Sequence, residues 1–171
     1  MRWAFSDESS RGNRLVLVAA IVETHDVNAV RGQVRGFLRP NQRRVHMAKE
    51  SPARRRQFAA LICELPIERC AVATGLSGRS IPDARERLMG ALAEELVGMG
   101  VESWMIEAIG PVQEKRDRRV IADAVRRLDL TAEFVYDHRP PHSDPLLWVA
   151  DGLAWLALDR RSLKVDVIDV P

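Results

Sequence analysis

The stretch from Leu146 to Leu158 constrains the fold more than any other part of this sequence. It contains thirteen residues, and Asp151 is the only charged one among them. A helix of this composition is apolar on every side, so it fits a place that is buried nearly all round. An ionised carboxylate in such a place is costly to desolvate unless something compensates its charge. The compensating group is an Arg side chain, a set of hydrogen-bond donors, or a metal ion shared with other carboxylates.

Length and composition indicate one globular domain, which we expect to span residues 1–171. Hydrophobic residues make up 46% of the chain and charged residues 29%, and the longest apolar run is too short to cross a bilayer. The N-terminus shows no signal segment, and Cys63 and Cys70 have no Cys or His at metal-ligand spacing beside them. We therefore expect a cytoplasmic protein with reduced cysteines and no membrane partner. A homodimer is compatible with these features.

The distribution of positive charge says more than the net charge, which is only +2. Of the 26 basic residues, all but Lys49, Lys115 and Lys164 are Arg. Guanidinium groups bind phosphates with two hydrogen bonds, so clusters of Arg suit an anionic polymer such as nucleic acid. For any single cluster, a solvated helix face in an Arg-rich protein is the favoured alternative. The clusters are Arg43-Arg44, Arg54-Arg55-Arg56, Arg116 with Arg118-Arg119, Arg126-Arg127 and Arg160-Arg161.

Hydrophobic periodicity predicts strands that alternate with helices. The predicted strands are residues 3–6, 14–23, 67–74, 101–109, 131–136 and 164–170, and the predicted helices are residues 26–38, 52–64, 81–100, 113–128 and 146–158. Turn residues at 9–13 join the first two strands in a hairpin. The hairpin adds antiparallel pairing to the parallel pairing that alternation implies, so we expect an α/β fold with a mixed sheet flanked by helices. No glycine-rich nucleotide-binding motif is present.

Three acids occur where regular structure would place them at the edge or core of the sheet. Asp7 comes directly after the first predicted strand, Glu107 lies near the end of the strand 101–109, and Asp151 lies in the last helix. By alternation Glu107 shares a face with Met105 and Ser103. Three converging acids repel one another at low dielectric, which raises their pKa values unless cations neutralise them. Two divalent ions bridged by one carboxylate are a usual arrangement for in-line phosphodiester hydrolysis.

Each acid also has a structural interpretation. Asp7 could cap the turn that follows it, and Asp151 could neutralise a buried Arg. Glu107 could pair with Arg116 or Arg119 of the following helix. Because these interpretations are partly independent, all three acids being structural by coincidence is less expected than any one.

The order of the acids and elements resembles the RuvC-type branch of the ribonuclease H-like superfamily. More closely, the chain resembles the bacterial domain-of-unknown-function family 3800, on the stretches Phe5-Ser6-Asp7-Glu8-Ser9 and Leu147-Trp148-Val149-Ala150-Asp151-Gly152-Leu153-Ala154. That family has Gly where this chain has Ser10. The resemblance covers nearly the whole chain when residues 25–65 are taken as a helical insertion between the second and third strands. It implies a ribonuclease H-like fold and a metal-dependent nuclease-like site.

The leading hypothesis is therefore a divalent-metal-dependent nuclease that hydrolyses phosphodiesters of DNA or RNA. Asp7 would bridge two Mg²⁺ or Mn²⁺ ions, and Glu107 and Asp151 would each bind one. The alternative is a non-catalytic ribonuclease H-like module that binds nucleic acid or serves in assembly. A haloacid-dehalogenase-like phosphatase with Asp7 as nucleophile is disfavoured, since that family needs a second Asp where this chain has Ser9. On the leading hypothesis, Asp151 faces the ends of the first and fourth strands.

Four further residues are candidates for supporting the acids or contacting substrate. Glu8 should point away from Asp7, on the opposite face of the strand. His46 could orient a water molecule or touch a phosphate, although a solvated loop position is favoured. Lys49 and Arg116 belong to basic segments that could contact a nucleic acid.

Other conspicuous residues have structural explanations. Asp144 precedes Pro145 and is interpreted as a helix N-cap. Asp117 is placed in the first turn of its helix, where an acid suits the helix dipole. The tryptophans at 104, 148 and 155 lie in apolar contexts and are expected to be core residues rather than stacking surfaces for bases.

Overall fold

The computed structural model describes residues 1–128, 134–159 and 166–171. Within these residues the centre is a six-stranded sheet in the order β5-β4-β1-β2-β3-β6. Its strands are β1 (Arg2–Arg11), β2 (Arg14–Glu23), β3 (Glu68–Gly75), β4 (Val101–Glu107), β5 (Val135–Arg139) and β6 (Val167–Asp169). β2 is antiparallel to β1 and β3, whereas the pairs β1–β4, β4–β5 and β3–β6 are parallel. The predicted mixed α/β sheet is confirmed.

The first strand is longer than predicted. Instead of covering residues 3–6, β1 runs from Arg2 to Arg11, because it pairs with β2 along its whole length. Gly12, with a φ of 59°, then makes the tight turn of the hairpin. Asp7 consequently lies inside β1 and not directly after a strand, which corrects the prediction.

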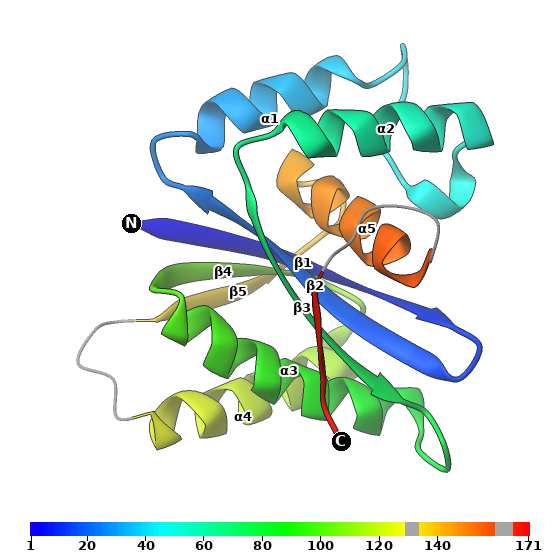
Figure 1. Ribbon diagram of the computed structural model, residues 1–171. Coiled ribbons are helices and arrows are strands. Elements are labelled where there is room, and N and C mark those ends of the chain that lie inside the picture. The colour runs from blue at the N-terminus through cyan, green and yellow to red at the C-terminus, as the bar shows by residue number, and fades with distance from the viewer. Residues whose placement is uncertain (129–133, 160–165) are drawn as a thin grey trace.

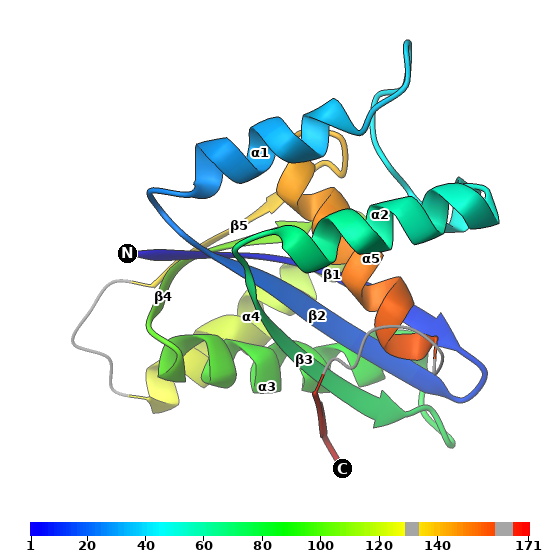
Figure 2. The same cartoon turned by 45° about the horizontal axis from the view of Figure 1, so that its top comes forward.

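Helices cover the two faces of the sheet in separate layers (Figure 1). On one side α5 (Pro145–Leu158) packs on β1 and β2, and α1 (Val27–Gly36) and α2 (Pro52–Glu64) pack on α5. α3 (Ile81–Gly98) and α4 (Pro111–Arg127) cover the other side, as the rotated view in Figure 2 also shows. Together with the short 3₁₀ helix η1 (Met47–Lys49), α1 and α2 form the predicted helical insertion between β2 and β3.

The position of α5 explains why its sequence is apolar all round. The sheet lies on one side of this helix and the insertion helices on the other, so ten of its fourteen residues are buried. Gly152 allows the close approach of α2, because a Cβ atom there would lie 2.5 Å from Cδ1 of Ile62. Asp144 is the predicted N-cap, and its Oδ1 accepts a hydrogen bond from the Leu146 N–H at 3.0 Å.

The other predicted elements agree with the structure to within a few residues. The strands predicted at 131–136 and 164–170 are observed as Val135–Arg139 and Val167–Asp169. Residues 131–133, residues 164–165 and the Arg160-Arg161 cluster lie outside the described residues. None of the helices in the described ranges combines the length and apolar composition that crossing a bilayer requires. A single domain over residues 1–171 stays a prediction.

The tryptophans serve mainly as core residues. Trp104 is fully buried, and its indole N–H donates to Oγ of Ser6 at 2.8 Å. Trp148 is also buried and donates to the carbonyl oxygen of Pro141 at 2.8 Å. Trp155 is only partly buried. Both buried indoles thus find a hydrogen-bond partner within the fold.

Candidate active site

Asp7 and Glu107 lie on neighbouring strands at the point where β4 ends. The parallel ladder between β1 and β4 ends one residue before each of them. Phe5 and Met105, two positions earlier in their strands, pack in the apolar cluster that includes α5. Because side chains alternate along a strand, Asp7 and Glu107 face the same helix. The structure thus brings together two acids that are one hundred positions apart in the chain.

Asp151 approaches the same place from α5. Its Oδ2 accepts a hydrogen bond of 2.7 Å from the backbone N–H of Met47, and its Oδ1 lies 3.2 Å from Nδ1 of His46. No Arg among the described residues forms an ion pair with Asp151. Hydrogen-bond donors of the insertion, and not a buried Arg, therefore compensate part of its charge.

The three carboxylates form one electrostatically linked cluster. Burial raises the pKa of Asp7 well above its ordinary value, and the charges of Glu107 and Asp151 raise it further. Burial also raises the pKa of Glu107, an effect that Arg44 opposes and Asp151 reinforces. Asp151 thus lies near both Asp7, in the middle of β1, and Glu107, at the end of β4. Nearby positive charge, from Arg44 and from Arg85, does not fully offset the repulsion at Asp7.

The basic segment of the insertion supplies two side chains to this cluster. Val45 and Met47 are buried in the core, and the two residues that alternate with them, Arg44 and His46, contact the acids. His46 has an extended backbone (φ −144°, ψ 110°), which is the conformation that produces such alternation. The favoured interpretation of His46 as a solvated loop residue holds only in part: the residue lies in a loop and is partly exposed, but its ring also lies against Asp151. Alternation of apolar residues at 45 and 47 was the sequence pattern that could have revealed this.

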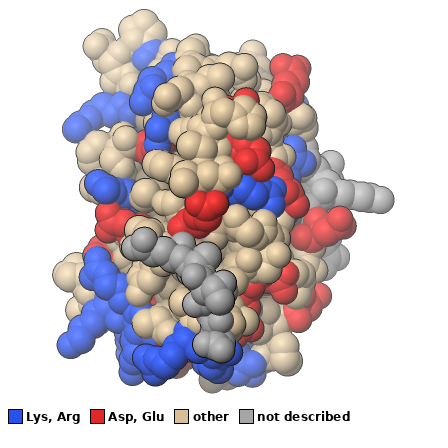
Figure 3. All heavy atoms as spheres, turned by 90° about the vertical axis from the view of Figure 1, so that its left-hand side faces the viewer, with Lys and Arg blue, Asp and Glu red and all other residues tan. Residues whose placement is uncertain are grey.

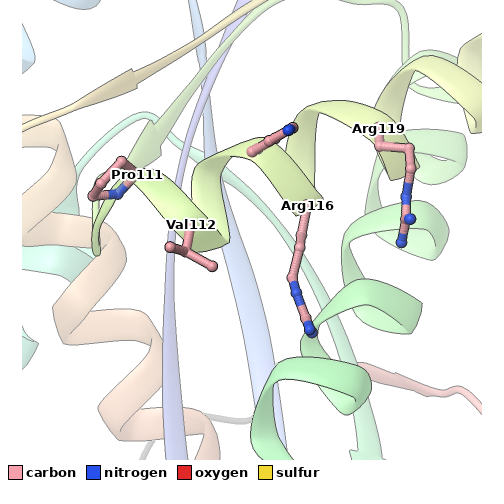
Figure 4. A pocket seen from close by; sticks show the side chains of 5 residues that line it. Pro111, Val112, Arg116 and Arg119 are labelled. Atoms are coloured by element: carbon pink, nitrogen blue, oxygen red, sulfur yellow. The ribbon is translucent and has the colours of Figure 1, made fainter.

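Glu107 pairs with Arg44 of the insertion, with 3.6 Å between Oε1 and Nη1. The alternative pairing with Arg116 or Arg119 is not observed. In Figure 4 Arg116 extends from α4 toward α3, and its Nη1 lies 3.3 Å from Glu86. Arg119 pairs with the same carboxylate at 3.0 Å. Arg116, a candidate for substrate contact, is therefore engaged on the side of the sheet away from α5.

A second charged cluster lies on the side of the sheet that α3 and α4 cover, and it was not predicted from the sequence. Glu8 points away from Asp7, as alternation predicts, and pairs with Arg85 of α3. Arg85 also pairs with Asp117 of α4, at 2.8 Å between Nη2 and Oδ2. His138 of β5 lies 3.1 Å from the same carboxylate, through Nε2. These four side chains tie β1 to α3, α4 and β5.

Asp117 is the centre of this cluster and has no exposed surface. Burial raises its pKa, but hydrogen bonds from His138, Arg85 and Gln113 lower it more, so that its pKa is lowered to about 2. The interpretation of Asp117 as a first-turn residue that complements the helix dipole is wrong. α4 begins at Pro111, so Asp117 lies in the second turn on the buried face.

The acid cluster fits a divalent cation in the chemistry of its donors. Carboxylate oxygens are the ligands that Mg²⁺ and Mn²⁺ prefer. The pKa values of Asp7 and Glu107 are raised first by burial and then by neighbouring carboxylates, whose charge a cation would neutralise. As the side chains lie, however, no three His, Cys, Asp or Glu residues in the described ranges are arranged so that they could hold a metal ion. The carboxylates would have to draw closer together to share one.

Comparison with known proteins identifies the fold. The sequence matches no protein-family profile and no curated protein. Among solved structures, the chain is similar to the ribonuclease HII of the PCNA:RNase HII complex from Archaeoglobus fulgidus, with a TM-score of 0.62 and 16% sequence identity. The similarity covers 93% of this chain and 72% of that one. The chain therefore has a ribonuclease H-like fold.

Proposed function

We propose that this protein is a divalent-metal-dependent nuclease that hydrolyses phosphodiester bonds of DNA or RNA. The observation that supports the proposal most directly is the meeting of Asp7, Glu107 and Asp151 at the end of the β1–β4 ladder. Ligand sites of open α/β sheets occur at the carboxyl ends of parallel strands. Glu107 is the last residue of β4, and Asp7, although inside β1, lies one residue beyond the parallel β1–β4 pairing. The ribonuclease H-like fold, seen also in an archaeal ribonuclease HII, agrees with this assignment.

In the proposed site Asp7, Glu107 and Asp151 would hold divalent ions, Mg²⁺ or Mn²⁺. Such ions supply a water of lowered pKa and stabilise the leaving oxygen. Groups of the insertion orient one of these carboxylates. The Met47 N–H and the His46 ring fix the orientation of Asp151. No described residue bonds to Nε2 of His46, so this nitrogen is free to orient a water molecule or contact a phosphate.

A cleavage assay tests the proposal. The purified protein is incubated with labelled single-stranded and double-stranded DNA and RNA and with an RNA–DNA hybrid, in Mg²⁺, Mn²⁺ or EDTA. We expect metal-dependent cleavage, lost by at least about 100-fold in Asp7→Asn. Asp137→Asn, which changes a partly exposed acid on β5 that pairs with Arg139, is the matched control and should cleave as the wild type does. Absence of cleavage with every metal, or equal cleavage by Asp7→Asn, would refute the nuclease assignment.

The alternative is a non-catalytic ribonuclease H-like module that binds nucleic acid or serves in assembly. Among the described residues, no three His, Cys, Asp or Glu side chains are arranged to hold a metal ion, which favours this alternative. It predicts that divalent metal neither supports turnover nor stabilises the fold. The resemblance to family 3800, on the stretches around Asp7 and Asp151, remains part of the proposal, as do a cytoplasmic location and a homodimer.

A further inference from the structure

A cavity of about 470 Å³ lies within the insertion, beside the acid cluster. Two of its lining residues belong to that cluster, since Arg44 pairs with Glu107 and His46 lies against Asp151. The cavity therefore opens directly next to the carboxylates. Its basic and imidazole lining residues are Arg39, Arg43, Arg44, His46 and Lys49.

The segment that lines this cavity is held in a fixed shape. The N–H of Gln42 donates to the carbonyl oxygen of Arg39 at 3.0 Å, and the N–H of Arg39 donates to Oε1 of Gln42 at 3.1 Å. Asn41, with a φ of 66°, completes this tight turn. Beyond the turn, Val45 and Met47 are buried in the core. A segment fixed in this way loses little conformational entropy when a ligand binds to it.

Two basic side chains in this lining are available for an anion. Arg43 and Lys49 are exposed, and neither side chain forms a hydrogen bond or ion pair with any described residue. The one acid of the described lining, Glu50, is already matched, because it lies 3.6 Å from Arg54 and 3.8 Å from Arg39. Positive charge at Arg43 and Lys49 is therefore uncompensated within the fold.

Most basic residues of α4, by contrast, are paired with acids. On the face shown in Figure 3, Lys and Arg gather along the left and lower edges, and Asp and Glu lie mostly in the middle and toward the right. On α4 itself, Arg118, Arg119 and Arg127 pair with acids at 3.6, 3.0 and 2.9 Å. Most of this helix's positive charge is thus matched within the fold, unlike that of the insertion cavity.

We infer that the insertion cavity binds backbone phosphates of a nucleic-acid strand, next to the phosphodiester that the acid cluster would cleave. This inference rests on the proposed function and names the segment that would hold its substrate. The Arg43 guanidinium can bind a phosphate through two hydrogen bonds, and the Lys49 ammonium adds a point charge. Arg44 and His46, which line both the cavity and the acid cluster, connect the two.

The salt dependence of binding tests this inference. Affinity for a labelled single-stranded RNA and for a labelled RNA–DNA hybrid is measured in EDTA at several salt concentrations, for the wild type and for Arg43→Ala/Lys49→Ala. The logarithm of the binding constant falls linearly with the logarithm of the salt concentration. Each lost phosphate contact makes this slope less steep by about 0.7 for a single strand and about 0.9 for a duplex. We expect the double variant to lose about 1.4 to 1.8 of slope and to bind several-fold more weakly at low salt.

A matched control removes one Lys and one Arg from α4. Lys115→Ala/Arg126→Ala should keep the wild-type slope, and the conservative Arg43→Lys change should retain most of it. Inorganic phosphate at matched ionic strength should compete only weakly, because a single phosphate lacks the neighbouring contacts. An unchanged slope in Arg43→Ala/Lys49→Ala, an equal loss in the α4 control, or no binding by the wild type would each overturn the inference.

The outcomes also separate this inference from the nuclease proposal. If the wild type cleaves nucleic acid but the cavity variant binds normally, the cavity assignment fails and the nuclease proposal stands. If binding depends on Arg43 and Lys49 but no metal supports cleavage, the cavity assignment stands and the protein is a binding module.

Discussion

Asp7 and Glu8 are consecutive residues of β1 whose carboxylates lie in different charged clusters on opposite faces of the sheet. The backbone N–H of Glu8 donates to Oδ1 of Asp7 at 2.7 Å, while the Glu8 side chain pairs with Arg85. One strand therefore connects an acid cluster with too little positive charge to a second cluster in which Arg85 is matched by Glu8 and Asp117. Neutralising a carboxylate should therefore raise stability in the first cluster and lower it in the second.

Removing the charge of Asp7 should stabilise the protein. Its raised pKa means that the ionised form of the carboxylate opposes folding. We expect Asp7→Asn to raise stability by on the order of 1 kcal/mol, which is about 2 to 4 °C in Tm for a chain of this size. Thermal unfolding followed by circular dichroism in EDTA at pH 7 measures the shift.

The advantage of Asp7→Asn should shrink on acidification. A raised folded-state pKa means that the folded protein takes up this proton before the unfolded chain does, so the wild type regains the stability as the pH falls toward the ordinary carboxyl pKa. A less stable Asp7→Asn protein at pH 7 would contradict the assignment of Asp7 as a destabilising charge.

Divalent metal should stabilise the wild type if the acid cluster binds it. A ligand that binds only the folded state adds about 2.7 kcal/mol at one hundred times its Kd, or several degrees in Tm. We expect Mn²⁺ and Mg²⁺ to give this shift in the wild type, and a much smaller one in Asp7→Asn and in Glu107→Gln. Differential scanning fluorimetry provides the measurement. Equal shifts in all three proteins would place the metal elsewhere, and no shift would favour the non-catalytic module.

Asp117→Asn should destabilise the protein strongly. The substitution leaves the buried Arg85 and His138 without their shared carboxylate, and breaking a buried ion pair typically costs about 3–5 kcal/mol. Urea unfolding at pH 7 measures the loss. Asp123→Asn, on the same helix but about half exposed and paired with Arg126 at 3.3 Å, should cost little.

The carboxylate of Asp117 should also make the stability of the protein depend on pH in the acid range. With a folded-state pKa of about 2, Asp117 contributes stability that is fully present above the ordinary carboxyl pKa and lost as the pH falls through about 2. The difference between the wild type and Asp117→Asn should therefore narrow between about pH 4 and pH 2. A difference that stays constant over this range would show that Asp117 acts through packing alone.

Gly152→Ala should disturb the contact between α5 and α2. The new Cβ would lie 2.5 Å from Cδ1 of Ile62 and 3.2 Å from Phe58, so the side chains must move. We expect a loss of about 1–3 kcal/mol, as for other overpacked cores. Ile62→Val removes the clashing atom, so the double variant should be more stable than the sum of the single changes predicts. Strict additivity in urea unfolding would argue against this clash.

Local patterns were enough to predict a mixed sheet flanked by helices, whereas the helical insertion followed from the resemblance to a known family. The apolar run around Asp151 correctly indicated a helix buried on all sides, because that pattern depends only on composition. The length of β1 was underestimated because the residues after Ser6 are polar, and only pairing with β2 keeps them in the strand.

Contacts between distant side chains could not be predicted in the same way. Arg85, Asp117 and His138 come from three different elements, and each fits an ordinary surface position in its own sequence context. His46 was assigned to solvent because a basic, irregular segment is usually solvated. Its real surroundings depend on how the insertion folds over α5, which no short stretch of sequence encodes.

Met47 has two roles in one residue. Its side chain is buried in the core, and its backbone N–H holds Asp151. The same residue thus helps to pack the insertion and to orient the carboxylate of Asp151 in the acid cluster. Evolution could alter the exposed basic side chains of this segment, and with them the choice of polyanion, while the buried positions between them keep the acids in place.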